Sequence, residues 1–198
     1  MTELAVARPD APPGARPSGW WGMVLLIATE ATLFALLLAT YFYLRFETVG
    51  PWPPDGIADP KIVKPLIATI VVAAAAVPLG WASATAGRLR PRDAQLGLAT
   101  GIGLGVGFLV FQYVLVQESL DRFRPETNAY GSIFYTLVGL HFVHVAVGVL
   151  LAIWALARTA RFDRTAVLTV RVTSLYWSFM AVVSAVVFLT LYLSPRGG

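Results

Sequence analysis

The segment that most constrains the fold spans residues 130–148 and reads YGSIFYTLVGLHFVHVAVG. It stays apolar up to about Ala157, and a helix of that length crosses a bilayer core of roughly 30 Å at about 1.5 Å of rise per residue. The segment also contains both histidines of the chain, His141 and His144. Their spacing of i and i+3 predicts that the two imidazoles share one face of the helix, with Gly148 further along the same face.

Three interpretations of the histidine pair stay open from the residues alone. The first is structural, with each imidazole hydrogen-bonded to a neighbouring helix or carbonyl, because an unpaired polar group in hydrocarbon costs several kcal/mol. The second is a proton-linked or lipid-headgroup site, since ionisable residues inside membranes often mark function. The third is a metal or haem site, for which the ligands are too few: two histidines on one face cannot hold a haem from both sides, and the chain has no cysteine.

Composition places the chain among integral membrane proteins. Of its 198 residues, 57% are hydrophobic and 13% are charged, and the mean hydropathy of +0.70 is outside the range of soluble domains. Five apolar segments are each long enough to span a bilayer, so we expect an all-α fold of five transmembrane helices. The predicted helices cover residues 20–44, 66–86, 94–116, 131–157 and 168–193.

The predicted domain organisation is one membrane domain with two short tails. Residues 1–19 are rich in proline and alanine and lack the apolar run of a cleavable signal peptide, so we expect a disordered N-terminal tail. Residues 20–193 form the five-helix domain, and residues 194–198 form a C-terminal tail.

Lysine and arginine are divided unevenly between the two sides of the predicted membrane domain, with nine on one side and six on the other. The positive-inside rule therefore predicts a cytoplasmic N-terminus and, with five helices, a C-terminus outside. This orientation explains the basic residues, so nucleic acid is not an expected partner. The nine are Arg8, Arg16, Arg88, Arg90, Arg92, Arg158, Arg161, Arg164 and Arg171, and the six are Arg45, Lys61, Lys64, Arg122, Arg124 and Arg196.

Glu30 is the only carboxylate deep inside a predicted span. It lies ten residues after Trp20, which with Trp21 is suited to the headgroup boundary, and ten residues of helix rise about 15 Å. Glu30 is therefore expected near the bilayer midplane, where a charge is costly. Either its carboxyl group is protonated and hydrogen-bonded to a hydroxyl or imidazole, or it belongs to a proton-linked or lipid site with the histidines.

Glycines recur at four-residue spacing in the third predicted helix, at Gly97, Gly101 and Gly105. This small-xxx-small pattern is typical of membrane helices whose backbones approach closely. We expect these glycines, together with Gly148, to form helix-packing surfaces.

Three motifs extend along almost the whole chain. WWG at residues 20–22 is followed by Glu30, Phe34 and Tyr41; residues 130–148 fit the pattern YGSxF...GxHxxHVxxG; and Tyr176 and Trp177 form a YW pair early in the last helix. Together they resemble subunit III of the haem-copper oxidases, the cytochrome c oxidase and quinol oxidase family, in its short five-helix bacterial form. The resemblance runs from about residue 20 to residue 193.

The chain departs from the family pattern at three positions. The histidine and aspartate that usually follow the YW pair are replaced here by Ser178 and Ala181. The family acid that follows a glutamine in the third helix is replaced by Leu115, if Gln112 is the matching glutamine. The chain therefore resembles a divergent member, in which a polar network from the last helix to the histidines is in doubt.

The resemblance implies an accessory subunit without a redox centre or catalytic residues, in the bacterial cytoplasmic membrane. Such subunits resemble a V, here two helices facing three, with phospholipid held in the cleft. They pack on subunit I, beside subunit II and in some cases within a larger respiratory supercomplex, and they stabilise subunit I and its proton uptake. Haem and copper are then expected in the partner subunits only.

The resemblance and the residue patterns together give a set of candidate site residues. A buried polar, lipid-linked or proton-linked group is expected at Glu30, His141 and His144. A lipid interface is expected at Trp20, Trp21, Tyr176 and Trp177.

Two other functions stay open. An accessory subunit of a nitric oxide reductase would share the same helix pattern. A small proton-coupled transporter would use Glu30 and the histidines as a relay, although the sequence contains no visible inverted repeat or discontinuous helix pair.

Overall fold

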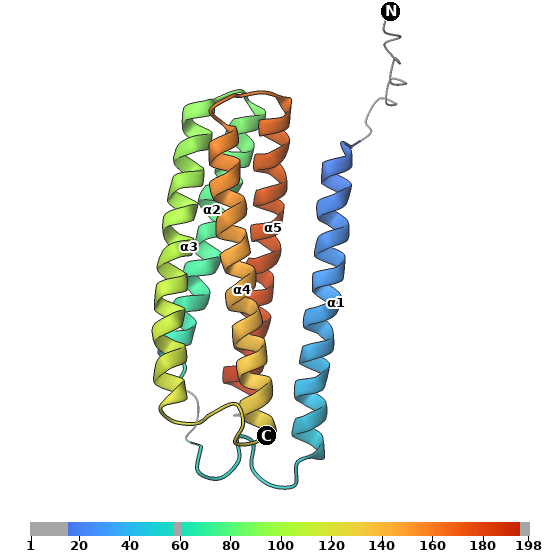
Figure 1. The fold of residues 1–198 in the computed structure, drawn as a ribbon, viewed down its shortest axis with the longest axis vertical. Coiled ribbons are helices and arrows are strands. Elements are labelled where there is room, and N and C mark those ends of the chain that lie inside the picture. Colours follow the sequence, from blue (N-terminus) through green and yellow to red (C-terminus); the bar gives the residue numbers. More distant parts are fainter. Residues whose placement is uncertain (1–15, 58–60, 195–198) are drawn as a thin grey trace, which may run out of the picture.

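The protein is described here by a computed structural model, which covers residues 16–57 and 61–194. Within these ranges it contains five long helices that run alternately in opposite directions (Figure 1). Their bounds are α1 Ser18–Glu47, α2 Val63–Gly87, α3 Pro91–Leu120, α4 Ala129–Arg158 and α5 Arg164–Phe188, the last followed by a π-helical turn, η1 Leu189–Leu193. In the described part of the chain all five are long and apolar enough to cross a membrane. The predicted all-α fold with five membrane spans is confirmed.

Each helix begins two to four residues earlier than predicted. Two of these starts have a side-chain cap: Asn128 accepts a hydrogen bond of 2.8 Å from the amide of Gly131, and Asp163 accepts one of 2.7 Å from the amide of Ala166. Such caps satisfy amides that the first helical turn leaves free, so the helix extends beyond its apolar segment. The predicted tails lie almost entirely outside the described residues.

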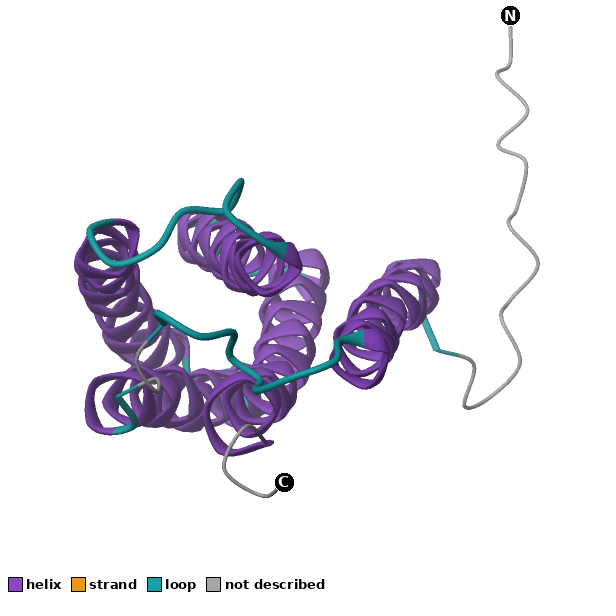
Figure 2. Cartoon of the chain, turned by 90° about the horizontal axis from the view of Figure 1, so that it is seen from below, coloured by secondary structure: helices purple, strands orange, loops and turns teal. Residues whose placement is uncertain are grey.

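The helices form a group of four with a fifth helix alongside it (Figures 1 and 2). Helix α2 packs against α3 and α5, α4 packs against α3 and α5, and α1 lies against α4 and α5. The predicted V of two helices facing three is consistent with this arrangement but is not confirmed by it. The loops at residues 88–90 and 159–163 lie at one end, here named the N-terminal end, and the segments at 48–57, 61–62 and 121–128 lie at the C-terminal end.

Small residues bring the backbones of the four-helix group close together. A Cβ atom added to Gly97 would lie 2.6 Å from the carbonyl oxygen of Pro78 in α2, and one added to Gly105 would lie 2.7 Å from Val149 in α4. Gly101 faces Leu79 of α2 in the same way. The three glycines of α3 therefore lie at its contacts with α2 and α4, where no larger side chain fits.

Helix α1 is joined to the rest mainly at its C-terminal end. Tyr41 is fully buried there, and its ring packs edge-on against Trp52 with 5.7 Å between ring centroids. The hydroxyl group of Tyr41 lies 3.2 Å from the hydroxyl of Ser194, and Arg45 donates a hydrogen bond of 2.8 Å to the carbonyl oxygen of Ser194. Much of α1 remains exposed and apolar, including Leu25, Leu36 and Phe46. That surface is suited to lipid or to another membrane protein.

Candidate functional site

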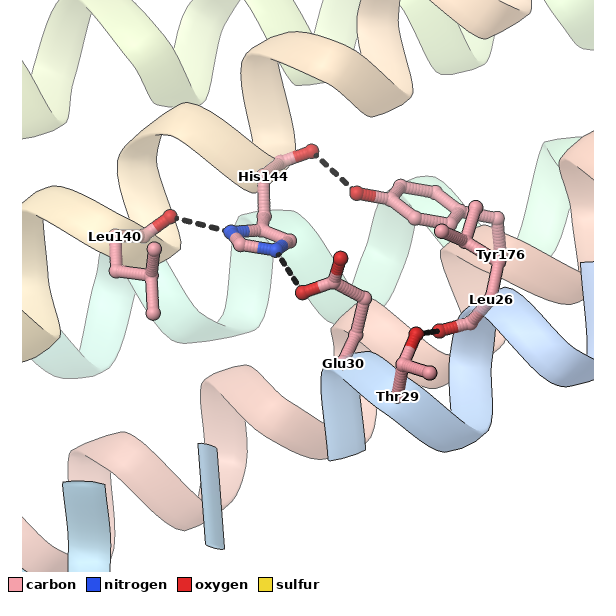
Figure 3. A network of polar contacts seen from close by, with 6 residues as sticks. All are labelled: Leu26, Thr29, Glu30, Leu140, His144 and Tyr176. Atoms are coloured by element: carbon pink, nitrogen blue, oxygen red, sulfur yellow. Dashed lines mark hydrogen bonds and ion pairs between the residues drawn. The ribbon is translucent and has the colours of Figure 1, made fainter. Parts of the chain in front are cut away.

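Glu30 of α1 and His144 of α4 point toward each other across the contact between these helices (Figure 3). The Oε2 atom of Glu30 lies 2.7 Å from Nε2 of His144. The side chains are 23% and 12% exposed, so both are largely shielded by protein. The structure thus brings together two of the three polar residues that the sequence indicated, from helices more than a hundred residues apart.

The hydrogen bonds of His144 fix how many protons the pair holds. Its Nδ1 lies 2.8 Å from the carbonyl oxygen of Leu140, and a carbonyl can only accept, so Nδ1 carries a proton. The contact between Nε2 and Glu30 then contains one further proton, on the imidazole of an ion pair or on the carboxyl group of a neutral pair. Both arrangements are neutral overall, which is the least costly condition for two ionisable groups in an apolar span.

The rest of the surroundings hold His144 in place. The ring of Phe34 on α1 packs edge-on against the imidazole with 5.1 Å between centroids. Tyr176 of α5 donates a hydrogen bond of 2.9 Å to the backbone carbonyl of His144, which Figure 3 also shows. Three helices therefore meet at this histidine, and the site is a junction of α1, α4 and α5.

His141 lies apart from this pair. Its side chain points into the four-helix group, where the ring of Phe108 on α3 packs edge-on at 5.6 Å between centroids. The residue is 6% exposed. The i, i+3 spacing does place the two histidines one turn apart, but α1 covers one of them and α3 the other. They therefore occupy two different surroundings.

The predicted lipid-facing aromatic residues divide into two pairs. Trp21 is 54% exposed, and the guanidinium group of Arg16 lies 4.2 Å from the ring centroid of Trp20, an arrangement suited to the membrane boundary. The placement of Tyr176 and Trp177 at a lipid interface is wrong, because both are buried in the four-helix group at 1% and 0% exposure. Hydrogen bonding explains the difference: Trp177 Nε1 donates to the carbonyl oxygen of Gly148 at 3.1 Å, and Tyr176 donates to α4 as described above.

The positions that depart from the family pattern lie outside the Glu30–His144 pair. The hydroxyl of Ser178 is exposed and bonds the Ser174 carbonyl of its own helix. Gln112 is buried in the four-helix group, and Leu115 belongs to the core. In the described part of the chain, no group of three or more histidine, aspartate or glutamate side chains lies close enough to hold a metal ion.

Sequence reasoning missed the connection between α1 and the end of the chain. Arg45 was noted only as a charge that follows the first span, and Ser194 only as the first residue of a tail. No local pattern could have paired them, because their contact depends on where η1 ends. Lys64 at the start of α2 and Glu118 near the end of α3 also form an ion pair that spacing could not indicate, with 2.6 Å from Nζ to Oε2.

The fold and the site define a class: a multi-pass membrane protein with a partly buried acid–imidazole pair between its first and fourth spans. A family model described as cytochrome c oxidase subunit III matches residues 17–195. Cytochrome c oxidase subunit 3 of Bacillus subtilis is 32% identical over 184 residues, which cover 91% of this chain and 86% of that protein. The corresponding protein of Synechocystis is 28% identical over 183 residues, covering 87% of this chain and 74% of that protein. The chain belongs to the cytochrome c oxidase subunit III family.

Proposed function

We propose that the chain is the accessory subunit III of a proton-pumping haem-copper terminal oxidase in a bacterial cytoplasmic membrane. It would contact mainly subunit I, and also subunit II, and these partners would contain the haem and copper that reduce oxygen. The match of the family model to residues 17–195 supports this assignment. The N-terminal end of the molecule, where the loops at residues 88–90 and 159–163 lie, would face the cytoplasm, as the distribution of basic residues predicts.

The Glu30–His144 pair is the observation that carries the accessory role. It lies within the apolar span of α1, a helix that has only two buried residues, Phe34 and Tyr41. Since few other contacts hold α1 against α4 and α5, the pair sets the position of α1 at this depth of the membrane. An α1 helix held in this way would present its apolar surface to subunit I and so stabilise the larger subunit.

Proton uptake by the oxidase is the process that we expect this pair to support. The pair holds one proton between two groups, and that proton can lie on either partner without a change in net charge. A pair of this kind can pass a proton from one partner to the other without creating a net charge inside the membrane. Its role would be to position or buffer, because no reacting atom of the oxidase lies in this chain.

A cleft at the N-terminal end supports binding of a phospholipid. It has a volume of about 1080 Å³ and lies between the ends of α1, α2 and α5. Arg16, Arg164 and Arg171 contribute positive charge, and Trp20 and Leu168 contribute apolar surface. Arginine side chains at a membrane boundary favour an anionic phosphate group, while the apolar surface favours acyl chains. We infer that an anionic phospholipid occupies this cleft.

Gentle purification of the tagged full-length chain from native membranes tests the assignment. We expect it to co-purify with a haem-containing subunit, and the complex to consume oxygen with cytochrome c or quinol as the electron donor. A complex that reduces nitric oxide instead would favour the related reductase. A chain that purifies alone and moves protons in liposomes would favour the transporter, and either result would contradict the proposal.

A further inference from the structure

His141 is a buried ionisable residue that the Glu30–His144 pair does not use. Its imidazole forms no hydrogen bond with any described residue, and its Nε2 is fully buried. A polar ring in this condition inside a membrane span is costly, and native proteins usually satisfy such groups with protein or with an ordered water molecule. A hydrogen-bond partner for this ring is therefore expected beside it.

A small cavity lies beside His141, at the centre of the four-helix group. Its volume is about 30 Å³, and residues from α2, α3, α4, α5 and η1 line it. A single water molecule needs about 10–15 Å³ of such space, so one water fits, and at most two. A space of this size suits water.

The walls of the cavity contain further polar groups without partners. Gln112, Ser184 and Tyr192 line it together with His141, and none of these side chains forms a hydrogen bond within the described ranges. Gln112 and Ser184 are 9% and 4% exposed. Gln112, Ser184 and Tyr192 come from α3, α5 and η1, and with His141 of α4 they line one space of molecular size. Water in a protein interior typically has two to four partners of this kind.

A route from the C-terminal end of the molecule leads toward this cavity. A second cavity of about 330 Å³ lies there, lined in part by Lys64, Glu118 and Arg122, which are charged groups of the membrane boundary. Pro65 and Tyr192 line both cavities. The cavity at the charged end is therefore a neighbour of the cavity at His141.

We propose that the cavity beside His141 is an internal water site, in which His141, Gln112 and Ser184 hold one ordered water molecule inside the membrane span. The site lies in the four-helix group, whereas the Glu30–His144 pair lies between α1 and α4. It gives the protein a hydrated, protonatable group that is separate from the pair at the α1 contact. The water is supplied from the C-terminal end, past Tyr192.

Water-edited solid-state NMR of the full-length chain in lipid bilayers tests this site. The chain has two histidines, so labelling histidine with ¹³C and ¹⁵N gives two imidazole signal sets, and the His144→Gln variant assigns them. We expect magnetisation to pass rapidly from water to the ring of His141. Ser184→Val and Gln112→Leu, which replace hydrogen-bonding groups with apolar ones, should slow this transfer several-fold.

Thr173→Val is the matched control, because Thr173 is a buried α5 residue whose hydroxyl has no described partner and which does not line the cavity. It should leave the transfer to His141 unchanged. No transfer from water to His141 in the unmodified chain would overturn the proposal. This measurement does not depend on whether any variant folds. Equal effects of Ser184→Val and Thr173→Val, or no effect of Ser184→Val and Gln112→Leu, would also overturn it.

Discussion

The carboxyl group of Glu30 lies 2.7 Å from Nε2 of His144, and the other nitrogen of that ring donates to a backbone carbonyl. The hydrogen bond to the backbone carbonyl determines how the contact with Glu30 is protonated. It fixes the proton on Nδ1, so Nε2 and the carboxyl group share a single further proton. A substitution that keeps the hydrogen bond but cannot release this proton therefore separates a structural role from a proton-linked one.

We predict that Glu30→Gln keeps stability and Glu30→Ala lowers it. The glutamine amide can donate to Nε2 of His144, whereas alanine leaves that nitrogen unpaired, and interhelical hydrogen bonds in membranes contribute about 0.6 to 1.7 kcal/mol. Thermal unfolding of the complex measures this difference. In the purified oxidase, both variants should leave the haem absorbance unchanged and shorten the time for which turnover continues, since neither can exchange the shared proton.

Thr29→Ala is the control for these two variants. Thr29 is next to Glu30 on α1, but its hydroxyl donates to the Leu26 carbonyl of its own helix at 2.8 Å. It should behave like the unmodified protein in both assays. Turnover by Glu30→Gln that lasts as long as that of the unmodified complex would show that the pair is structural only.

The glycines of α3 give a second prediction, from two residues of the same helix. Gly97→Ala should destabilise the protein by about 1–3 kcal/mol, because its Cβ would lie 2.6 Å from the backbone oxygen of Pro78, which cannot rotate away. Gly103→Ala should cause no loss, since no atom lies within 4 Å of its added Cβ. Thermal unfolding in detergent would measure both. Equal losses would contradict the packing explanation, since alanine is the better helix former and only Gly97 has a close neighbour.

The buried indole of α5 gives a third prediction. Trp177→Phe should lower the free energy of unfolding by about 1–3 kcal/mol, because it removes the hydrogen bond to the Gly148 carbonyl and opens space beside Gly105. Trp154→Phe should change it by less than about 0.5 kcal/mol, since Trp154 is 52% exposed. Chemical denaturation in mixed micelles compares the two. A Trp154 effect as large as that of Trp177 would contradict the burial of the YW pair.

The C-terminal contact of α1 gives a fourth prediction. Arg45→Met keeps the aliphatic stem but removes the donor to the Ser194 carbonyl, so the amides of residues 189–194 should exchange with deuterium several-fold faster. Arg88→Met is the control, because the Arg88 side chain is exposed and forms no hydrogen bond or ion pair within the described residues. Hydrogen exchange followed by mass spectrometry reads both segments. Unchanged exchange in Arg45→Met would show that this contact does not hold η1.

The sequence by itself determined the five spans and which of them contain Glu30 and the histidines. Each backbone amide in a membrane span must be satisfied within its own helix, so apolar length alone fixes where these helices lie. The helix starts were predicted less well, because side chains such as Asn128 and Asp163 extend the helices into polar segments. Local hydrogen bonding therefore accounts both for the correctly predicted spans and for the errors in the helix starts.

The tertiary structure alone decided which side chains meet. It paired Glu30 with His144 rather than His141, buried Tyr176 and Trp177, and joined Arg45 to Ser194. A membrane helix is apolar on nearly all sides, so hydropathy does not reveal which face contacts protein and which contacts lipid. That choice depends on the neighbour and the rotation of each helix, and these are set by packing between residues distant in the sequence.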